Sequence, residues 1–128
     1  MINYNQQMEN LINNLSGTPT LLLHSCCGPC STAVITRLKN HFDITVFYYN
    51  PCLYPNSEYE KRLNEQIKFI NKLNEEECRN IKIVVPPFNP QSFYDAVKQV
   101  ENFDKLKEGG QRCYACYLQR LTATAKYA

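Results

Sequence analysis

The chain has 128 residues, a length that predicts one domain around one hydrophobic core and leaves no room for a second domain. Its 14 basic and 12 acidic residues give a formal charge of +2, which excludes a strongly basic nucleic-acid coat protein but allows a local basic patch. The hydrophobic share of 44%, with 9 tyrosines, 6 phenylalanines and no tryptophan, is typical of a globular protein rather than a disordered one.

Neither a membrane span nor a secretory signal is visible in the sequence. Apolar runs such as Leu21–Leu23 are far shorter than the roughly 18 residues needed to span a bilayer. The N-terminus has no basic stretch followed by an apolar core. We therefore expect a soluble, cytoplasmic protein that does not act at a membrane.

The first predicted element is an amphipathic helix. It ends at Gly17 and carries an apolar stripe formed by Tyr4, Met8, Leu11 and Leu15. Residues 20–24 predict a short buried strand, which leads into a cysteine-rich loop and a second helix. Residues 44–49 predict a second strand, and their nearly continuous apolar character is expected of a parallel strand covered on both faces.

The second half of the chain continues the alternation. The segment Ser57–Glu60 has the capping-box pattern, which predicts the start of a long helix with an apolar face formed by Tyr59, Leu63, Ile67, Ile70 and Leu73. Residues 81–85 predict a third strand. Asn89-Pro90 then predicts the N-cap and first residue of a helix whose buried stripe is Phe93, Val97 and Val100. A last helix is predicted to start near Arg112.

Strands that alternate with helices predict an α/β fold with a parallel sheet flanked by helices on both faces, a Rossmann-like three-layer arrangement. Ligands bind such sheets beyond the carboxyl ends of the strands. The segments His24–Cys30, Asn50–Tyr54 and Pro86–Asn89 should meet at that edge. Residues 120–128 still have a helical pattern with no terminating residue, which is typical of a truncated sequence whose C-terminal part lies outside it.

Five of the seven cysteines form two groups. Cys26, Cys27 and Cys30 lie between the first predicted strand and its helix, where unpaired backbone amides and the helix dipole stabilise thiolates. Cys113 and Cys116 are three residues apart on the last helix, so their sulfurs share one face. Clustered cysteines in a cytosolic chain indicate metal binding or redox chemistry rather than packing alone. We expect these five sulfurs to converge in the fold.

Three kinds of chemistry fit these cysteines. Cys27-Gly28-Pro29-Cys30 matches the C-G-P-C motif of thioredoxin-like dithiol oxidoreductases, an interpretation that gives Cys113 and Cys116 no role. A structural zinc-binding module is the second, although the two C-x-x-C pairs are much farther apart than the roughly 15–20 residues of a zinc ribbon. The third is an iron–sulfur cluster, which uses up to four thiolates and leaves one or two for an adjacent metal.

Several motifs occur together in one order. They are His24-Ser25-Cys26-Cys27-Gly28-Pro29-Cys30, then Tyr49-Asn50-Pro51 with Pro55, Glu58-Tyr59 and Arg62, and finally Glu108 to Cys116 with Arg120-Leu121. This set covers nearly the whole chain from Thr20 onward and resembles the epoxyqueuosine reductase QueH family. The N-terminal helix, residues 1–18, lies outside the motifs.

The resemblance implies a cytoplasmic oxidoreductase of the last step of queuosine biosynthesis, which reduces the epoxide of the modified wobble base of a tRNA to a cyclopentene with loss of water. It implies that residues 1–128 form a single α/β metal-binding catalytic domain. It also implies a 4Fe-4S cluster, an adjacent mononuclear iron held by cysteine and aspartate, and an unidentified electron donor. The metal-ligand pool is then Cys26, Cys27, Cys30, Cys113 and Cys116.

Two positions depart from the family pattern. Cys52 stands where the family has asparagine, and it is either an extra ligand or a neutral replacement. Asn89 aligns with an aspartate of the family, and an uncharged amide is a poorer metal ligand than a carboxylate. We interpret Asn89 chiefly as a helix N-cap, a role that Asn and Asp fill about equally well, and keep it as a candidate ligand. Cys78 lies at a solvated helix end and is interpreted as structural.

Candidate residues for catalysis and substrate binding lie near the same edge. The candidate proton donors are His24 and Tyr49. The candidates for binding phosphate or ribose are Arg62, Arg112 and Arg120, and those for stacking on an unpaired anticodon base are Tyr48, Tyr54 and Tyr114. The alternative role of Arg62 is an ion pair with Glu58 on the helix surface.

Overall fold

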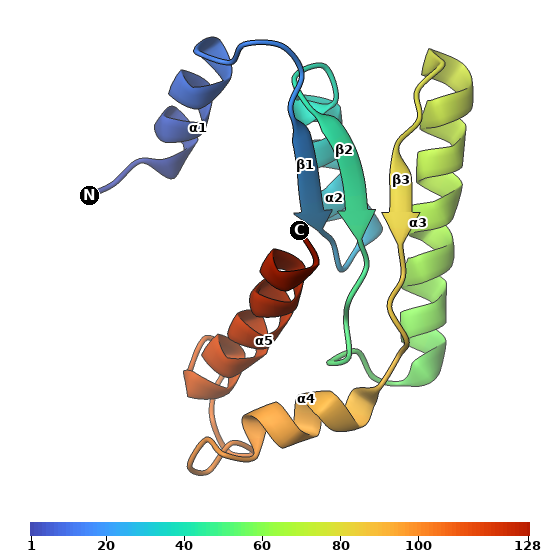
Figure 1. Ribbon diagram of the computed structural model, residues 1–128. Coiled ribbons are helices and arrows are strands. Elements are labelled where there is room, and N and C mark those ends of the chain that lie inside the picture. The colour runs from blue at the N-terminus through green and yellow to red at the C-terminus, as the bar shows by residue number, and fades with distance from the viewer.

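The computed structural model describes residues 1–128 as a three-stranded parallel sheet with helices around it (Figure 1). In chain order the elements are α1 (Tyr4–Asn13), β1 (Thr20–His24), α2 (Gly28–Leu38), β2 (Asp43–Phe47), α3 (Asn56–Glu77), β3 (Lys82–Val84), α4 (Pro90–Val97) and α5 (Gln111–Tyr127). This arrangement confirms the predicted α/β class and the order of helices and strands. None of the helices has the length and apolar character that crossing a bilayer requires.

The strands pair in the order β1-β2-β3, all parallel. β1 pairs with β2 along its whole length, so His24 lies opposite Phe47 at the end of both strands. β2 ends earlier than the predicted range 44–49, although the Tyr48 amide still donates to the Val84 carbonyl at 2.9 Å. The loops that follow β1 and β2 therefore start side by side at one edge.

The hydrophobic core lies on one face of the sheet, under α2 and α3. Side chains alternate between the two faces along a strand, and this face receives Ile44 and Val46 of β2. They form one buried cluster with Ile35 of α2, Ile70 of α3 and Ile12 of α1. Full burial of such side chains is worth about 1.5–3 kcal/mol each, so the apolar stripes hold both helices against the sheet.

The opposite face of the sheet is met by the end of α5. Phe47 points to this face, and its ring centroid lies 4.9 Å from that of Tyr127. α5 also contacts β1. Helices thus lie on both faces, α2 and α3 on one and the C-terminal end of α5 on the other.

α4 and α5 extend beyond the carboxyl ends of the strands (Figure 1). The two helices are neighbours, and the loop between them is held by Arg112, whose Nη1 donates to the Phe103 carbonyl at 2.9 Å. This arrangement brings α5 to the edge where the loops after β1 and β2 begin.

The side-chain capping hydrogen bonds predicted at the starts of two helices do not form. α3 begins directly after Pro55, so Ser57 lies inside its first turn and forms no capping box, and the Glu58 carboxylate binds Arg62. Asn89 is the N-cap residue of α4, but its side chain makes no capping hydrogen bond. Its backbone carbonyl, and not its amide group, bonds to the following turn.

Two helices also end earlier than their apolar patterns predict. α1 ends at Asn13, because the Asn14 side chain donates to the Asn10 carbonyl at 2.7 Å and closes the last turn. α4 ends at Val97, and Val100 belongs to a separate turn that its amide closes onto the Val97 carbonyl.

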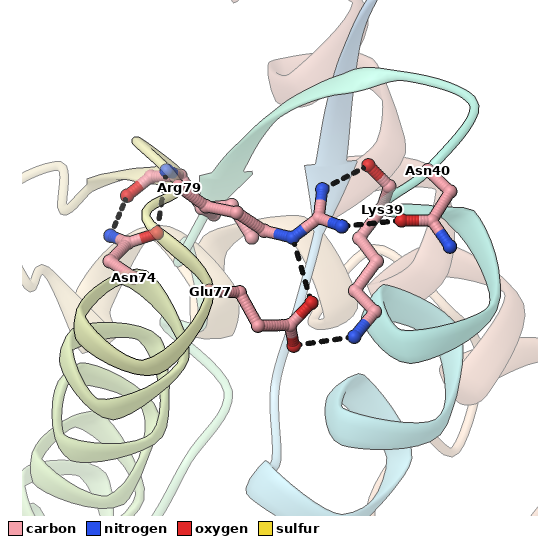
Figure 2. A network of polar contacts seen from close by, with 6 residues as sticks. Lys39, Asn40, Asn74, Glu77 and Arg79 are labelled. Carbon is pink, nitrogen blue, oxygen red and sulfur yellow. Dashed lines mark hydrogen bonds and ion pairs between the residues drawn. The ribbon is translucent and has the colours of Figure 1, made fainter.

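A polar network ties the ends of α2 and α3 together at the amino edge of the sheet (Figure 2). Arg79 donates to the Lys39 carbonyl at 2.8 Å and to the Asn40 side chain. Glu77 pairs with both Lys39 and Arg79. The Asn74 side chain bonds to the backbone just before β3 at 2.9 Å through both its nitrogen and its oxygen. This end of the core is therefore fixed independently of the cysteine-rich edge.

Candidate metal centre

The loop between β1 and α2 carries three cysteines. Cys27 is the N-cap residue of α2 and, like Cys26, is half-buried, whereas Cys30 is exposed. The hydrogen bond between the Cys27 and Cys30 thiols lowers the pKa of Cys27 and raises the pKa of Cys30. The Cys26 side chain also bonds to Cys27. The start of α2 thus presents three connected thiols where unpaired backbone amides favour anions.

Polar contacts hold this loop against the end of β2. His24 Nε2 lies 2.9 Å from the Tyr49 carbonyl oxygen and donates to it, because a carbonyl only accepts. Asn50 Nδ2 donates to the Ser25 carbonyl at 2.7 Å. Burial lowers the pKa of His24, and the charge of Arg120 lowers it further. The His24 imidazole is therefore neutral at neutral pH.

Cys116 of α5 faces the turn that follows β2. It is buried, and its thiol is hydrogen-bonded to the half-buried Cys52. This hydrogen bond and the charge of Arg120 together outweigh burial and lower the pKa of Cys116 to about 6. The same hydrogen bond, with burial, raises the pKa of Cys52. Of these two thiols, Cys116 is therefore the one that ionises more readily, and Cys52 is its hydrogen-bond donor.

Arg120 is buried among these groups, one turn after Cys116. Only 9% of its surface is exposed. Its guanidinium interacts with Cys52, Cys116 and Cys26, and it lies 5.2 Å from the centroid of the Tyr117 ring. Its Nε has no hydrogen-bond partner. Arg120 is thus a buried cation whose anionic neighbours are thiols, and it links Cys26 on one side with Cys52 and Cys116 on the other.

The cysteines at this edge form two hydrogen-bonded groups joined by Arg120, namely the trio in the β1–α2 loop and the Cys52–Cys116 pair. Cys113 lies one turn before Cys116, and its Sγ accepts a hydrogen bond from the Gly109 amide at 3.2 Å. No three His, Cys, Asp or Glu side chains stand together as ligands of a single metal ion.

A pocket of about 850 Å³ opens beside the Cys27–Cys30 pair, between the start of α2 and α3. The residues that α3 contributes to it are Glu58, Lys61, Arg62, Glu65 and Phe69. Arg62 Nε donates to Glu58 at 2.7 Å, which confirms the predicted ion pair, and the Arg62 charge also interacts with Cys26 and Cys27. The pocket therefore combines thiols with charged side chains of both signs.

The chain matches the family model described as "Epoxyqueuosine reductase QueH" over residues 21–128. It belongs to the QueH family. It is 38% identical to the epoxyqueuosine reductase QueH of Staphylococcus aureus and 33% identical to that of Streptococcus pyogenes, over 99% of this chain but 54% and 50% of those proteins. The relative from Acinetobacter baylyi is 37% identical over 84% of this chain and 46% of its own length. The QueH match confirms the resemblance drawn from the motifs, and the chain spans about half the length of these curated relatives.

The thiols of this QueH chain are the ligand type of an iron–sulfur cofactor, although they stand in two groups and the five sulfurs do not converge as expected from the sequence. Such clusters are held by cysteine thiolates, and the α2 amides and the Arg120 guanidinium both complement the negative charge of a thiolate-bound cluster. Arg120 Nε is a buried donor without a partner, a condition that native proteins rarely leave uncompensated. Asn89, the other candidate ligand, is exposed at the start of α4.

The remaining predicted binding residues of the QueH chain differ in accessibility. Tyr54 and Tyr114 are 81% and 64% exposed, so their rings are free to stack. Arg112 is partly committed to the backbone of the preceding loop. Tyr48 is fully buried with its hydroxyl donating to the Tyr59 carbonyl at 3.0 Å, so its predicted stacking role is wrong.

Sequence reasoning missed a buried polar network beneath the cysteine loop. Gln66 of α3 is fully buried, and its Nε2 donates to the hydroxyls of Ser25 and Ser31. The Ser31 hydroxyl donates to the Cys27 carbonyl at 2.7 Å. The signal was available, because position 66 has the right helical spacing from the buried Tyr59 and Ile70, on the inward face of α3.

Proposed function

We propose that the chain is the metal-binding catalytic part of an epoxyqueuosine reductase, which reduces the epoxide of the queuosine precursor at the tRNA wobble position. In this reaction two electrons and two protons enter, both C–O bonds of the epoxide break, a C=C bond forms and the oxygen leaves as water. Redox cofactors supply electrons for reactions of this kind, and an electron donor must then restore them. Support comes from the QueH family match and from the thiols gathered around Arg120.

The proposed cofactor is a 4Fe-4S cluster with an adjacent mononuclear iron, held by ligands drawn from Cys26, Cys27, Cys30, Cys113 and Cys116. When bound, these groups supply electrons singly and polarise the epoxide oxygen through a metal with an open position. The contribution of the chain is electrostatic, because the α2 amides and Arg120 stabilise the thiolate ligands. The Gly109 amide donates to Cys113 Sγ, and a hydrogen bond of this kind also stabilises a metal-bound thiolate.

Neither His24 nor Tyr49 is the proton donor in this proposal. The Nε2–H of neutral His24 is committed to the Tyr49 carbonyl, and donation to substrate would need an imidazolium that burial and Arg120 disfavour. His24 is therefore a positioning residue that holds the end of β2. The Tyr49 hydroxyl, whose oxygen lies 3.5 Å from Gln119 Nε2, lines a different pocket against α4 and α5, so it is not assigned as the proton donor to a nucleoside beside Cys27 and Cys30.

The pocket beside Cys27 and Cys30 is the proposed site of the modified nucleoside. Its volume of about 850 Å³ lies within the range of small-molecule sites. Lys61 and Arg62 supply positive charge for the tRNA backbone, and the exposed rings of Tyr54 and Tyr114 offer stacking surfaces. With a net charge of only +2, we expect tRNA binding to depend on a few such contacts and to weaken with salt.

The dithiol alternative uses only Cys27 and Cys30 of these thiols. In thioredoxin-like enzymes the attacking group is an accessible thiolate with a lowered pKa. Here the lowered pKa belongs to the half-buried Cys27, whereas the exposed Cys30 has a raised pKa. This distribution is the one expected of a C-x-x-C pair whose first thiol attacks, so the point against the alternative is that it gives Cys113 and Cys116 no role.

One observation carries the proposal: in a QueH chain, the charge of Arg120 acts on both Cys26 and Cys116, which come from distant parts of the sequence, and Cys116 is also hydrogen-bonded to it. The test is to purify the chain anaerobically, measure iron and acid-labile sulfide, and assay reduction of tRNA bearing epoxyqueuosine by nucleoside mass spectrometry. We expect an iron-loaded protein whose activity is lost in Cys26→Ser and Cys116→Ser but kept in Cys78→Ser, a change of an exposed cysteine. A zinc-loaded protein, or a metal-free one that reduces insulin through Cys27 and Cys30, would overturn it.

A further inference from the structure

Two charged side chains of the pocket between α2 and α3 are not engaged with other protein charges. Arg62 and Glu58 neutralise each other in an ion pair at 2.7 Å. Lys61 and Glu65 line the same pocket and are four residues apart on one helix face, yet neither takes part in an ion pair. Both are exposed. The pocket therefore offers one free cation and one free anion to a ligand.

Glu65 lies where α3 approaches the start of α2. A Cβ atom added to Gly28 would lie 3.8 Å from Glu65 Cβ, an ordinary van der Waals distance, so the two helices are close at this point. Phe69, one turn after Glu65, adds an apolar ring to the same lining. A ligand held in this pocket beside the Cys27 and Cys30 thiols would therefore have the Glu65 carboxylate among its neighbours.

A carboxylate discriminates between guanine and a base that carries an ammonium group. The edge of guanine that includes N7 presents only hydrogen-bond acceptors, N7 and O6, and a carboxylate also only accepts. Glu65 would therefore repel this edge. The queuosine precursor has a carbon atom in place of N7, and an aminomethyl group joins this carbon to the epoxide-bearing ring. Its amine is protonated at neutral pH, as alkyl amines are, and can donate to a carboxylate.

We propose that Glu65 is a specificity-determining residue that binds the ammonium group of the modified wobble base and disfavours unmodified guanine. This inference rests on the function proposed for the pocket. Lys61 has the complementary role, because it binds a phosphate that modified and unmodified RNA share and so adds affinity without discrimination. Specificity of this kind combines an attractive contact to the correct ligand with a repulsive one to its competitor.

Three anticodon stem–loop RNAs that differ only at the wobble base test the proposal by equilibrium binding to the anaerobically purified chain. One carries guanine, one carries 7-aminomethyl-7-deazaguanine, which has the ammonium group without the epoxide-bearing ring, and one carries epoxyqueuosine. We expect the wild type to bind the two ammonium-bearing RNAs more tightly than the guanine RNA. Glu65→Gln should weaken both of them by about tenfold, the effect of one hydrogen bond to a charged group, and should bind the guanine RNA as tightly as before or more tightly.

Two other positions on α3 provide matched controls. Glu75→Gln removes the same charge at an exposed position outside the pocket, about 15 Å farther along the helix, and should leave all three affinities unchanged. Lys61→Met should weaken all three RNAs equally and lower the slope of log K against log salt concentration by about one. Glu65→Asp keeps the charge and should keep the preference for the ammonium-bearing RNAs.

The inference and the proposed function fail in different ways. An equal loss of affinity for all three RNAs in Glu65→Gln, or a preference for the ammonium-bearing RNAs that survives in this variant, would overturn the inference. A chain that reduces epoxyqueuosine in tRNA while Glu65→Gln keeps the preference refutes the role of Glu65 and leaves the enzyme standing. A chain that shows the Glu65-dependent preference but never reduces that tRNA refutes the proposed function and leaves the specificity role standing.

Discussion

Gln66→Met perturbs the buried network beneath the cysteine loop without opening a cavity, because methionine is unbranched and similar to glutamine in size. In the wild type, Gln66 Nε2 donates its two hydrogens to the Ser25 and Ser31 hydroxyls. The Ser31 hydroxyl donates to the Cys27 carbonyl, so Ser25 must be the donor in the bond between the two serines. That serine pair remains bonded in the variant.

The expected change in stability follows from two opposed effects. Removing two hydrogen bonds costs about 1–3 kcal/mol, at about 0.5–1.5 kcal/mol each. However, Gln66 Oε1 is buried without a partner, and such an oxygen costs about 1–3 kcal/mol, which the thioether removes. We therefore expect Gln66→Met to unfold with a free energy within about 1 kcal/mol of the wild type. Gln66→Ala, which leaves a cavity at a fully buried position, should lose about 2–4 kcal/mol.

Urea unfolding of the metal-free chain measures both variants, and hydrogen exchange of the Cys26–Ser31 amides measures the loop. We expect faster exchange in this segment of Gln66→Met, because the loop loses its two hydrogen bonds to α3, with unchanged exchange in β2. A loss of more than about 3 kcal/mol in Gln66→Met would mean that Oε1 has a partner. Unchanged exchange would mean that Gln66 does not hold the loop. Either result refutes the reasoning.

Three further predictions concern titration and packing. In the metal-free chain, alkylation of Cys116 should rise with a midpoint at a pH of about 6, and Cys52→Ala should move this midpoint upward by removing the main cause of the lowered pKa. Burial lowers the pKa of folded His24, so as pH falls below 6.5, the ordinary histidine pKa, the unfolded chain binds a proton that the folded chain does not. The wild type should therefore lose stability in this pH range, whereas His24→Asn should not. Urea unfolding at several pH values measures both. Asn74→Ala should lower the free energy of urea unfolding by about 1–3 kcal/mol, through two lost bonds to backbone, and leave the iron content of the anaerobically purified chain unchanged.

The sheet was predictable because side-chain periodicity is a direct consequence of strand geometry. β1 was predicted at its observed bounds, and the alternation that buries Ile44 and Val46 also buries Tyr48, two residues beyond. Applied one step further, the same rule would have removed Tyr48 from the stacking candidates. Gln66 was not predicted to be buried, because a polar side chain interrupts an apolar pattern even when its position lies on the buried face of the helix.

The position of the cysteine-rich edge was predictable, but the pairing of the thiols was not. Parallel strands bring the β1–α2 and β2–α3 loops to one edge whatever the side chains are. The partner of Cys116 depends on the rotation of α5 about its axis, which is set by packing against α4 and by contacts such as Phe47 with Tyr127. Helical spacing placed Cys113 and Cys116 on one face, yet it carries no information on which loop that face meets.

Charge balance at Arg120 decides between its two interpretations. The sequence offered it as a ligand for a tRNA phosphate, but a side chain that is only 9% exposed cannot meet a phosphate of the tRNA backbone without opening the α5 packing around it. In the metal-free protein its counter-ion is the Cys116 thiolate, which neutralises one positive charge with one negative charge. A thiolate-bound cluster would bring further negative charge to the same place, and the charge of Arg120 also acts on the Cys52 and Cys26 thiols. Arg120 therefore favours the state in which these sulfurs are ionised, and this is the state in which they bind metal.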